Sequence, residues 1–253
     1  MNISIIQALI LGVIQGLTEF LPLSSSGHLA IIQNMMGVNE SMLSLAIFLH
    51  LGTLMAVIIF FRRHILELTK KKIVWLLVVS IPVFIAGLLF HQQIDAMFSS
   101  LLTVGIMLII TGLMNLFNNK SSKKTLQNSN SASNQALFVG LLQALAILPG
   151  VSRSGSVLFA HRVLKIDNKK TFVNTFLLSI PVIIASVLFE LYKNMNLISE
   201  ISFSLPILIG IASSFIVGLI SLKILHKLVV QNKLYIFGYY CLALGSIIVI
   251  FHY

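Results

Sequence analysis

Long apolar stretches constrain the fold of this chain more than any other feature of its sequence. Six of them run at about 43–61, 73–90, 98–117, 171–191, 203–222 and 234–252. A helix needs ~20 apolar residues to cross the hydrocarbon core of a bilayer, so each stretch is long enough. Charged residues make up only 9% of the chain, against roughly 25% in ordinary soluble domains. The sequence therefore predicts an all-α polytopic membrane protein with six transmembrane helices, and it excludes a soluble enzyme.

Two further segments, 4–37 and 135–164, each contain an apolar stretch that runs into Pro, Ser and Gly before a second helical run. The second runs, 27–37 and 155–164, are too short to cross a bilayer. We expect each segment to form a re-entrant helical hairpin that enters the membrane and returns on the same side. Between them lies the polar stretch 118–134, NNKSSKKTLQNSNSASN, whose composition is typical of a flexible linker.

The halves on either side of this linker, 1–117 and 135–253, resemble each other. Gln7-Ala8-Leu9 recurs 128 positions later as Gln135-Ala136-Leu137. The same offset relates Ser24, Ser26 and Gly27 to Ser152, Ser154 and Gly155. Since each half has an odd number of crossings, the second half is expected to be inverted. The chain is thus predicted to be one membrane domain, 1–253, whose two hairpin tips meet near the bilayer midplane.

The net charge of +10 is read as an orientation signal, because basic loops of membrane proteins face the cytoplasm. If the loop 62–72 is cytoplasmic, the linker is cytoplasmic too, and 15 of the 17 lysines and arginines fall on that side. Both termini then face outward. No nucleic-acid partner is expected, and the single Cys241 excludes a disulfide framework.

Four ionisable residues fall deep in the predicted membrane segments: Glu19, His28, His50 and Arg153. Such groups are costly in hydrocarbon, so by default they mark a functional site. Three of them lie at or beside the hairpin tips. His50 lies early in a predicted spanning helix, where it either lines the site or is a buried, hydrogen-bonded histidine.

The first tip reads QGLTEFLPLSSSGH, from Gln15 to His28. Gln15 and Glu19 are four residues apart and therefore share one helix face. Pro22 ends this half-helix, and the next one opens with Ser24, Ser25, Ser26 and Gly27. A helix N-terminus with hydroxyl groups suits an anion. Alternatively, the serines only cap the helix, and Glu19 and His28 hold a polar turn together.

The second tip reads PGVSRSGS, from Pro149 to Ser156. Arg153 cannot be neutralised, and its planar fork suits the oxygens of a phosphate. Its neighbours Ser152, Ser154, Gly155 and Ser156 open another helix N-terminus. These residues predict a phosphate or carboxylate cradle, unless Arg153 only neutralises Glu19 as a structural ion pair.

The two tips would bring an acid, an imidazole, several hydroxyls and one fixed cation together in a membrane cavity. A carboxylate or imidazole can act as general base, and an arginine can stabilise the charge of a phosphoryl transfer. The set fits hydrolysis of a lipid-borne phosphate. It also fits proton-coupled transport of an anion.

These motifs resemble those of the undecaprenyl-diphosphate phosphatase family, also called the bacitracin-resistance protein family. The similarity covers nearly the whole chain. It rests on (E/Q)xxxE–PxSS(S/T)GH at Gln15–His28, (H/Q)LG(T/S) at His50–Thr53 and PGxSRSG at Pro149–Gly155. It implies an enzyme of the bacterial cell membrane that converts undecaprenyl diphosphate to undecaprenyl phosphate. That reaction recycles the carrier lipid for cell-wall synthesis and confers bacitracin resistance.

The resemblance also implies roles for particular residues. Glu19, Ser25, His28 and Arg153 match the family's functional residues, supported by Gln15, Ser24, Ser152 and Ser154. We expect further substrate contacts from Ser26, Gly27, Gly155, Ser156 and His50. The family implies stimulation by a divalent cation, Mg²⁺ or Ca²⁺, for which Glu19 is the candidate ligand.

Two positions depart from the family pattern. Gln15 stands where many members have Glu, which weakens a two-carboxylate metal site, and Val157 stands where members usually have Thr. The expected partners are undecaprenyl diphosphate, membrane lipid and a second copy of the chain as a homodimer. The sequence leaves open whether Ser25 or a water attacks the phosphorus. It also leaves open a flippase or transporter of a polyprenyl phosphate that uses the same midplane site.

Overall fold

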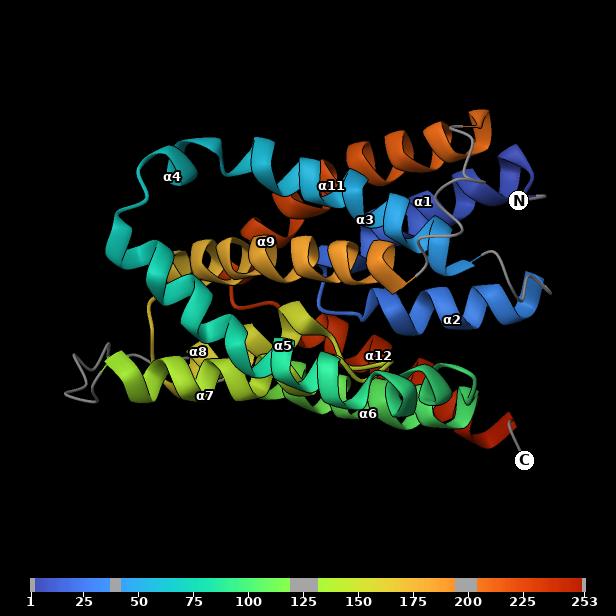
Figure 1. Cartoon of the computed structure of the whole chain (residues 1–253). Coiled ribbons are helices and arrows are strands. Elements are labelled where there is room, and N and C mark those ends of the chain that lie inside the picture. Colours follow the sequence, from blue (N-terminus) through green and yellow to red (C-terminus); the bar gives the residue numbers. More distant parts are fainter. Residues whose placement is uncertain (1–2, 37–41, 119–131, 194–203, 252–253) are drawn as a thin grey trace.

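The computed structural model describes residues 3–36, 42–118, 132–193 and 204–251. Within these ranges the regular structure is helical throughout, without a strand (Figure 1). The helices are α1 (Ile5–Phe20), α2 (Ser25–Met36), α3 (Met42–Phe60), α4 (Arg62–Leu66), α5 (Lys70–Phe98), α6 (Leu101–Phe117), α7 (Ala132–Leu145), α8 (Arg153–Val163), α9 (Asn168–Lys193), α11 (Leu205–Val230) and α12 (Tyr235–Phe251). Every apolar stretch predicted from the sequence forms a helix.

The boundaries differ from the predicted ones mainly around α5 and the linker. Helix α5 runs on to Phe98, well past the predicted end at residue 90, although Phe90 itself has non-helical dihedral angles (φ −116°, ψ 15°). Helix α7 begins at Ala132, inside the predicted linker. Residues 119–131 of that linker lie outside the described residues.

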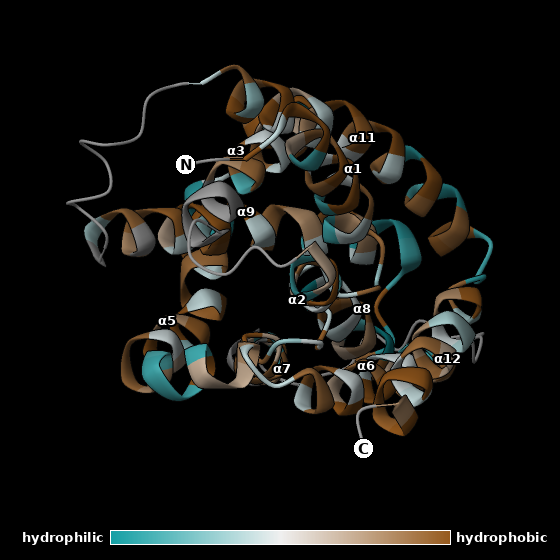
Figure 2. Cartoon of the chain, turned by 90° about the vertical axis from the view of Figure 1, so that its right-hand side faces the viewer, coloured by the Kyte–Doolittle hydropathy of each residue, from teal (hydrophilic) through white to brown (hydrophobic). Residues whose placement is uncertain are grey.

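The helices form two groups with two short helices between them. In Figure 1, α1, α3, α9 and α11 lie above, and α5, α6, α7 and α12 lie below. Viewed from the end in Figure 2, α2 and α8 lie inside a ring made by the others. Both termini lie at one end of the molecule, and α4 with the α8–α9 and α11–α12 connections lies at the opposite end (Figure 1).

Small residues allow some of these helices to approach very closely. A Cβ added at Gly16 on α1 would lie 2.6 Å from the carbonyl oxygen of Ser214 on α11. On α6, a Cβ at Gly112 would lie 2.9 Å from the carbonyl oxygen of Gly238 on α12. Close backbone contact through small residues is the usual way in which helices associate in lipid. These two contacts fix α1 and α6, the helices that carry the site and support it.

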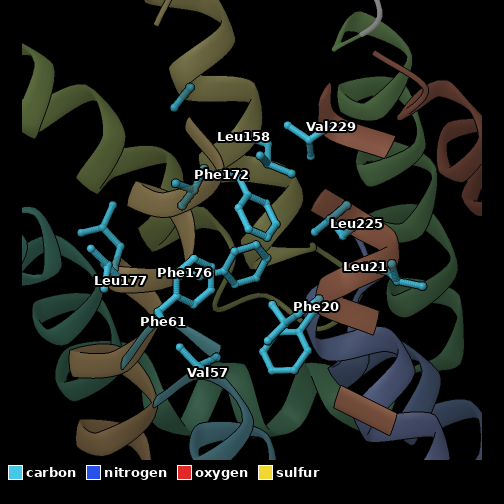
Figure 3. Packing of buried hydrophobic residues seen from close by; sticks show 14 of the residues in the cluster. Phe20, Leu21, Val57, Phe61, Leu158, Phe172, Phe176, Leu177, Leu225 and Val229 are labelled. Atoms are coloured by element: carbon cyan, nitrogen blue, oxygen red, sulfur yellow. The ribbon is translucent and has the colours of Figure 1, made fainter. Parts of the chain in front are cut away.

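An aromatic cluster anchors the inner end of α1 (Figure 3). The Phe20 ring packs edge-on against Phe176 of α9, with 5.6 Å between the ring centroids. Phe176 in turn stacks on Phe61 at 5.8 Å and meets Phe172 at 5.0 Å. Phe20, Phe61, Phe172 and Phe176 are all at most 2% exposed. Because Phe20 follows Glu19 directly, this cluster fixes where the carboxylate lies.

The outer surface is apolar, as a lipid-facing surface must be. Helix α5 alone exposes Leu77, Leu88 and Leu89, each at least 50% accessible, and Figure 2 shows apolar residues along most outer helices. Among the described residues, α11, the long helix α5 and residues Asn168–Phe189 of α9 are long and apolar enough to cross a membrane. Helices α6 and α12 are apolar but only 17 residues long. The chain is therefore an all-α protein of the membrane type.

Candidate active site

The site lies where the α1–α2 connection meets the α7–α8 connection. Both connections contain a residue in the left-handed region, Ser24 with φ 69° and Gly150 with φ 99°. The two backbones almost touch, since a Cβ added at Gly27 would lie 3.1 Å from the Cα of Gly150. Residues about 130 positions apart in the sequence are thus brought into one site.

Serine hydroxyls begin the second helix of each hairpin. The Gly27 N–H donates to Ser24 Oγ at 3.2 Å, and the Gly155 N–H donates to Ser152 Oγ at 3.1 Å. The hydroxyls of Ser26 and Ser154 bond to these same capping oxygens, as expected for serines that hold a tight turn. Because α2 and α8 both begin at the tips, the positive ends of two helix dipoles point into the site.

Glu19 is the centre of the polar contacts. Its side chain is 3% exposed and forms an ion pair through Oε1 with the guanidinium of Arg153. Its other oxygen, Oε2, accepts hydrogen bonds from Ser25 Oγ at 2.6 Å and from Gln15 Nε2 at 3.1 Å. His50 Nε2 lies 3.7 Å from the same oxygen. A carboxylate with this many partners is held in one orientation, and the Ser25 hydroxyl hydrogen points directly at it.

Arg153, His50 and Ser25 are the partly exposed members of the cluster. The Arg153 side chain is 19% exposed and that of His50 is 31% exposed, whereas Glu19 lies beneath them. A guanidinium beside two helix N-termini is a strong anion site, because charge-assisted hydrogen bonds and helix dipoles act together. The arrangement suits a phosphate placed over Ser25.

His28 is held by a tyrosine. In the part of the chain that the structure describes, it forms no hydrogen bond or ion pair with Glu19. Its Nδ1 lies 2.8 Å from the carbonyl oxygen of Ser24, so Nδ1 carries the proton in the neutral ring. Its Nε2 is then the acceptor for the Tyr240 hydroxyl at 2.9 Å. The two rings stack at 5.6 Å with 11° between their planes. Tyr240 thereby fixes both the tautomer and the orientation of His28.

Helix α6 braces both tips through two polar residues one turn apart. Thr111 Oγ1 donates to the carbonyl oxygen of Gly150 at 2.8 Å and accepts from the Ser152 N–H at 3.0 Å. Asn115 Nδ2 donates to the carbonyl oxygen of Pro22 at 2.6 Å. One helix therefore sets the position of each tip relative to the other.

The structure places the residues predicted from the sequence in two sets. Around the carboxylate lie Gln15, Glu19, Ser25, His50 and Arg153. The hydroxyls of Ser24, Ser26, Ser152 and Ser154 bond within their own tips, and the N–H groups of Gly27 and Gly155 donate to the capping serines. Ser156 Oγ lies 3.7 Å from Met114 Sδ.

Sequence reasoning missed Tyr240 and Thr111. Both lie in helices that appear as plain apolar spans, α12 and α6, so no motif surrounds them. Thr111 is a polar residue in an apolar span, and that polarity is the signal that could have marked it. A tyrosine in an apolar helix gives no comparable signal.

The donor set offers an incomplete site for a divalent cation. No group of three or more His, Cys, Asp and Glu side chains gathers within the described parts of the chain. However, Gln15 Oε1 is fully buried without a hydrogen-bond partner and belongs to a side chain bonded to Glu19. One carboxylate and one amide oxygen suit Mg²⁺, which is often held by few protein ligands together with substrate phosphates.

Comparison with known proteins shows relatives that are similar over nearly the whole chain. The chain is 38% identical to an undecaprenyl-diphosphatase of Halothermothrix orenii over 252 residues, covering 97% of each chain. It is 37% identical to an undecaprenyl-diphosphatase of Methanobrevibacter smithii, covering 96% of each. A third such enzyme, from Methanococcus maripaludis, is 38% identical, over 97% of this chain and 99% of its own.

The family model described as bacitracin resistance protein BacA matches residues 8–247, which include both hairpins and every residue around Glu19. With this match and full-length relatives above 30% identity, the chain belongs to the bacitracin resistance protein BacA family.

Proposed function

We propose that this protein hydrolyses undecaprenyl diphosphate to undecaprenyl phosphate and inorganic phosphate. The observation that carries the proposal is the Ser25 hydroxyl, which donates to Glu19 at 2.6 Å beside the Arg153 guanidinium. A nucleophile, its base and an oxyanion-stabilising cation are the parts that a phosphatase needs. The names of the relatives support hydrolysis and give no support to the flippase alternative. The reaction would recycle the carrier lipid for cell-wall synthesis and confer bacitracin resistance.

Substrate binding would rest on charge from the second tip. Arg153 would hold the diphosphate through its planar fork while keeping its contact with Glu19. The N-terminal N–H groups of α2 and α8 supply further donors from the two helices that begin at the tips. The terminal phosphorus would then lie over Ser25.

In the chemical step, Ser25 Oγ would attack the terminal phosphorus. A new Oγ–P bond forms, the bond from phosphorus to the bridging oxygen breaks, and the Ser25 proton passes to Glu19 Oε2. Arg153 stabilises the charge that develops on the transferred phosphoryl group, its usual contribution to such reactions. A water then attacks the phosphorus of the phosphoserine and the Oγ–P bond breaks. Inorganic phosphate leaves, and the proton on Glu19 returns to Ser25 Oγ.

Because the leaving group needs no proton from the protein, His28 need not act as a general acid and can bond to Tyr240 instead. Undecaprenyl phosphate leaves through a phosphate oxygen, and the second pKa of a phosphate monoester is about 6, so it needs no proton to depart near neutral pH. His28, whose two ring nitrogens bond to Ser24 and Tyr240, would instead hold the start of α2 in place. Tyr240 is thus a positioning residue.

A divalent cation would be held by Glu19 and the free Oε1 of Gln15, together with oxygens of the diphosphate. When bound, such an ion neutralises phosphate charge and orients the substrate. Because Gln15 replaces a second carboxylate, we expect Gln15→Glu to raise the affinity for Mg²⁺. Titration of phosphate release with Mg²⁺ would measure this change.

For the membrane arrangement, we propose one domain of two inverted repeats, 1–117 and 135–253, with six crossings and two re-entrant hairpins. The matching serine caps of α2 and α8 support the repeat. Both termini lie at one molecular end and the basic α4 lies at the other (Figure 1), which supports a cell-membrane protein whose termini face outward.

Phosphate release from undecaprenyl diphosphate by the purified protein tests the function. We expect turnover by the wild type and its loss in Glu19→Gln, which keeps the shape of the side chain but removes the base. Equal turnover by both proteins would contradict the assignment of Glu19. Absence of phosphate release from the folded wild type would contradict the function itself.

A further inference from the structure

A pocket with several polar side chains in its wall lies at the end of the molecule opposite the termini. It is formed by the last residues of α6, α8 and α11 and the first residues of α9 and the α11–α12 turn. Its cavity volume is about 20 Å³, and the pocket is open to the outside. Arg162, at its centre, lies nine residues after Arg153 on α8, roughly 14 Å along the helix axis. The pocket is therefore separate from the active site.

Two asparagines hold the Arg162 guanidinium in place. Its Nη1 donates to Asn168 Oδ1 at 3.0 Å and its Nη2 donates to Asn232 Oδ1 at 2.8 Å. Asn168 Nδ2 bonds to the same Asn232 oxygen at 3.1 Å. Asn232 has φ 53°, a left-handed conformation that asparagine tolerates well. The fork is thus rigid and partly buried, with only neutral partners.

Within the described parts of the chain, the positive charge of Arg162 has no carboxylate partner. Among the described residues no carboxylate lies within 4.0 Å of it, whereas Arg153 has Glu19. The nearby Asp167 caps α9 by accepting from the N–H groups of Lys169 and Lys170. Exposed Lys165 and Lys233 add further positive charge close by in the sequence. Partly buried cations are normally paired, so this pocket selects an anion.

Unused hydrogen-bonding groups lie in the same pocket wall. Arg162 Nε is buried and bonds to nothing in the described structure. The Asn118 side chain, only 3% exposed, likewise leaves both Nδ2 and Oδ1 without a partner. Buried polar groups are almost always hydrogen-bonded, so the two donors point to a ligand that supplies acceptor oxygens.

We propose that this pocket binds the phosphate of an anionic phospholipid headgroup. Phosphate oxygens match the free Nε–H of Arg162 and the Asn118 amide, and the lysines favour a headgroup with net negative charge. In the orientation proposed above, the pocket opens at the cytoplasmic end of the helix bundle, at the level where basic pockets bind lipid headgroups. The ligand would tie α6, α8, α9 and the α11–α12 turn together at that end.

The test measures the melting temperature of the detergent-solubilised full chain with added phosphatidylglycerol, phosphatidylcholine or sodium phosphate. We expect phosphatidylglycerol to raise it most, and Arg162→Gln to weaken the apparent affinity for phosphatidylglycerol by at least about tenfold. Arg63→Gln, which removes an exposed cation at the same end, is the matched control and should keep the wild-type response. Equal responses in both variants, or an equal effect of phosphatidylcholine, would overturn the proposal.

A second variant protects the test against a folding defect. Asn232→Asp keeps the acceptor oxygen for Arg162 and supplies an internal counter-charge, so it should fold and yet lose the response to phosphatidylglycerol. A full response in a folded Asn232→Asp would overturn the proposal. A shift with sodium phosphate that matches the lipid's would overturn the lipid assignment in favour of a free phosphate ligand.

Discussion

The tips of the two hairpins share a backbone arrangement and differ in chemistry. In each, a serine hydroxyl accepts from a glycine N–H three residues later, at 3.2 Å for Ser24 and 3.1 Å for Ser152. The residue after that serine is Ser25 in the first tip and Arg153 in the second. One turn thus presents a hydroxyl group, and its counterpart presents a cation.

This difference teaches that neither half contains a complete site. The first tip supplies the Ser25 hydroxyl beside the Glu19 carboxylate, and the second supplies the guanidinium that pairs with Glu19. Activity should therefore depend on contacts that join the halves, and the side chains at matched positions should not be interchangeable.

The largest effect is expected from the second tip. Arg153→Ala removes the only guanidinium of the cluster, and phosphate release should fall by about 10³-fold or more. Arg153→Lys should recover only part of the loss, because a lysine keeps the charge but not the planar fork. Wild-type turnover in Arg153→Ala would show that the second tip is structural only.

The equivalent change in the first tip is Ser25→Ala. If Ser25 is the nucleophile, kcat should fall by about 10³-fold. Ser26→Ala is the control. The Ser26 hydroxyl bonds to Ser24 within the same tip, and Ser26 follows Ser25 directly in the chain. We expect it to change turnover by less than about tenfold. Similar losses in both variants would mean that the hydroxyls act by capping alone.

The brace on α6 can be broken one tip at a time. Thr111→Val removes both hydrogen bonds to the second tip, which should cost about 1–3 kcal/mol of stability and lower kcat by about tenfold. Thr111→Ser keeps the hydroxyl and should restore both. The comparison variant Asn115→Leu releases only the first tip. Thermal unfolding and phosphate release measure each effect, and wild-type values in Thr111→Val would contradict the brace.

The smallest effect is expected from Tyr240→Phe. Loss of the hydroxyl frees His28 Nε2 and should lower kcat about two- to tenfold, with a changed pH profile but little change in KM. Tyr239→Phe removes the same group from the neighbouring position, where the ring meets Tyr235 instead. It should leave the pH profile unchanged. Identical profiles for both variants and the wild type would remove Tyr240 from the site.

The sequence predicted the helices and much of the cluster for physical reasons. Apolar length predicts a helix in lipid almost regardless of context, and Pro and Ser at the tips marked where helices stop and restart. The expectation that Glu19 and Arg153 meet followed from the matching halves, and the ion pair confirms that they do. Their catalytic roles remain predictions.

Two features could not be predicted in this way. His28 was expected near Glu19, but which atoms an imidazole contacts depends on the rotation of α2, and here that rotation turns it to Tyr240. Thr111 acts through the Gly150 carbonyl, a contact set by how α6 packs beneath the tip. Such contacts depend on tertiary packing. The sequence of an apolar span without periodic polar residues does not show which of its faces packs against a neighbouring helix.

The central claim is that the two tips together form one catalytic site. The most direct test is to follow the terminal phosphate of undecaprenyl diphosphate onto the protein. Purified enzyme mixed with substrate labelled at that phosphate, and quenched within one turnover, should carry label on Ser25. Arg153→Ala should carry almost none. Wild-type turnover without any label on Ser25, together with undiminished turnover in Ser25→Ala, would contradict the account.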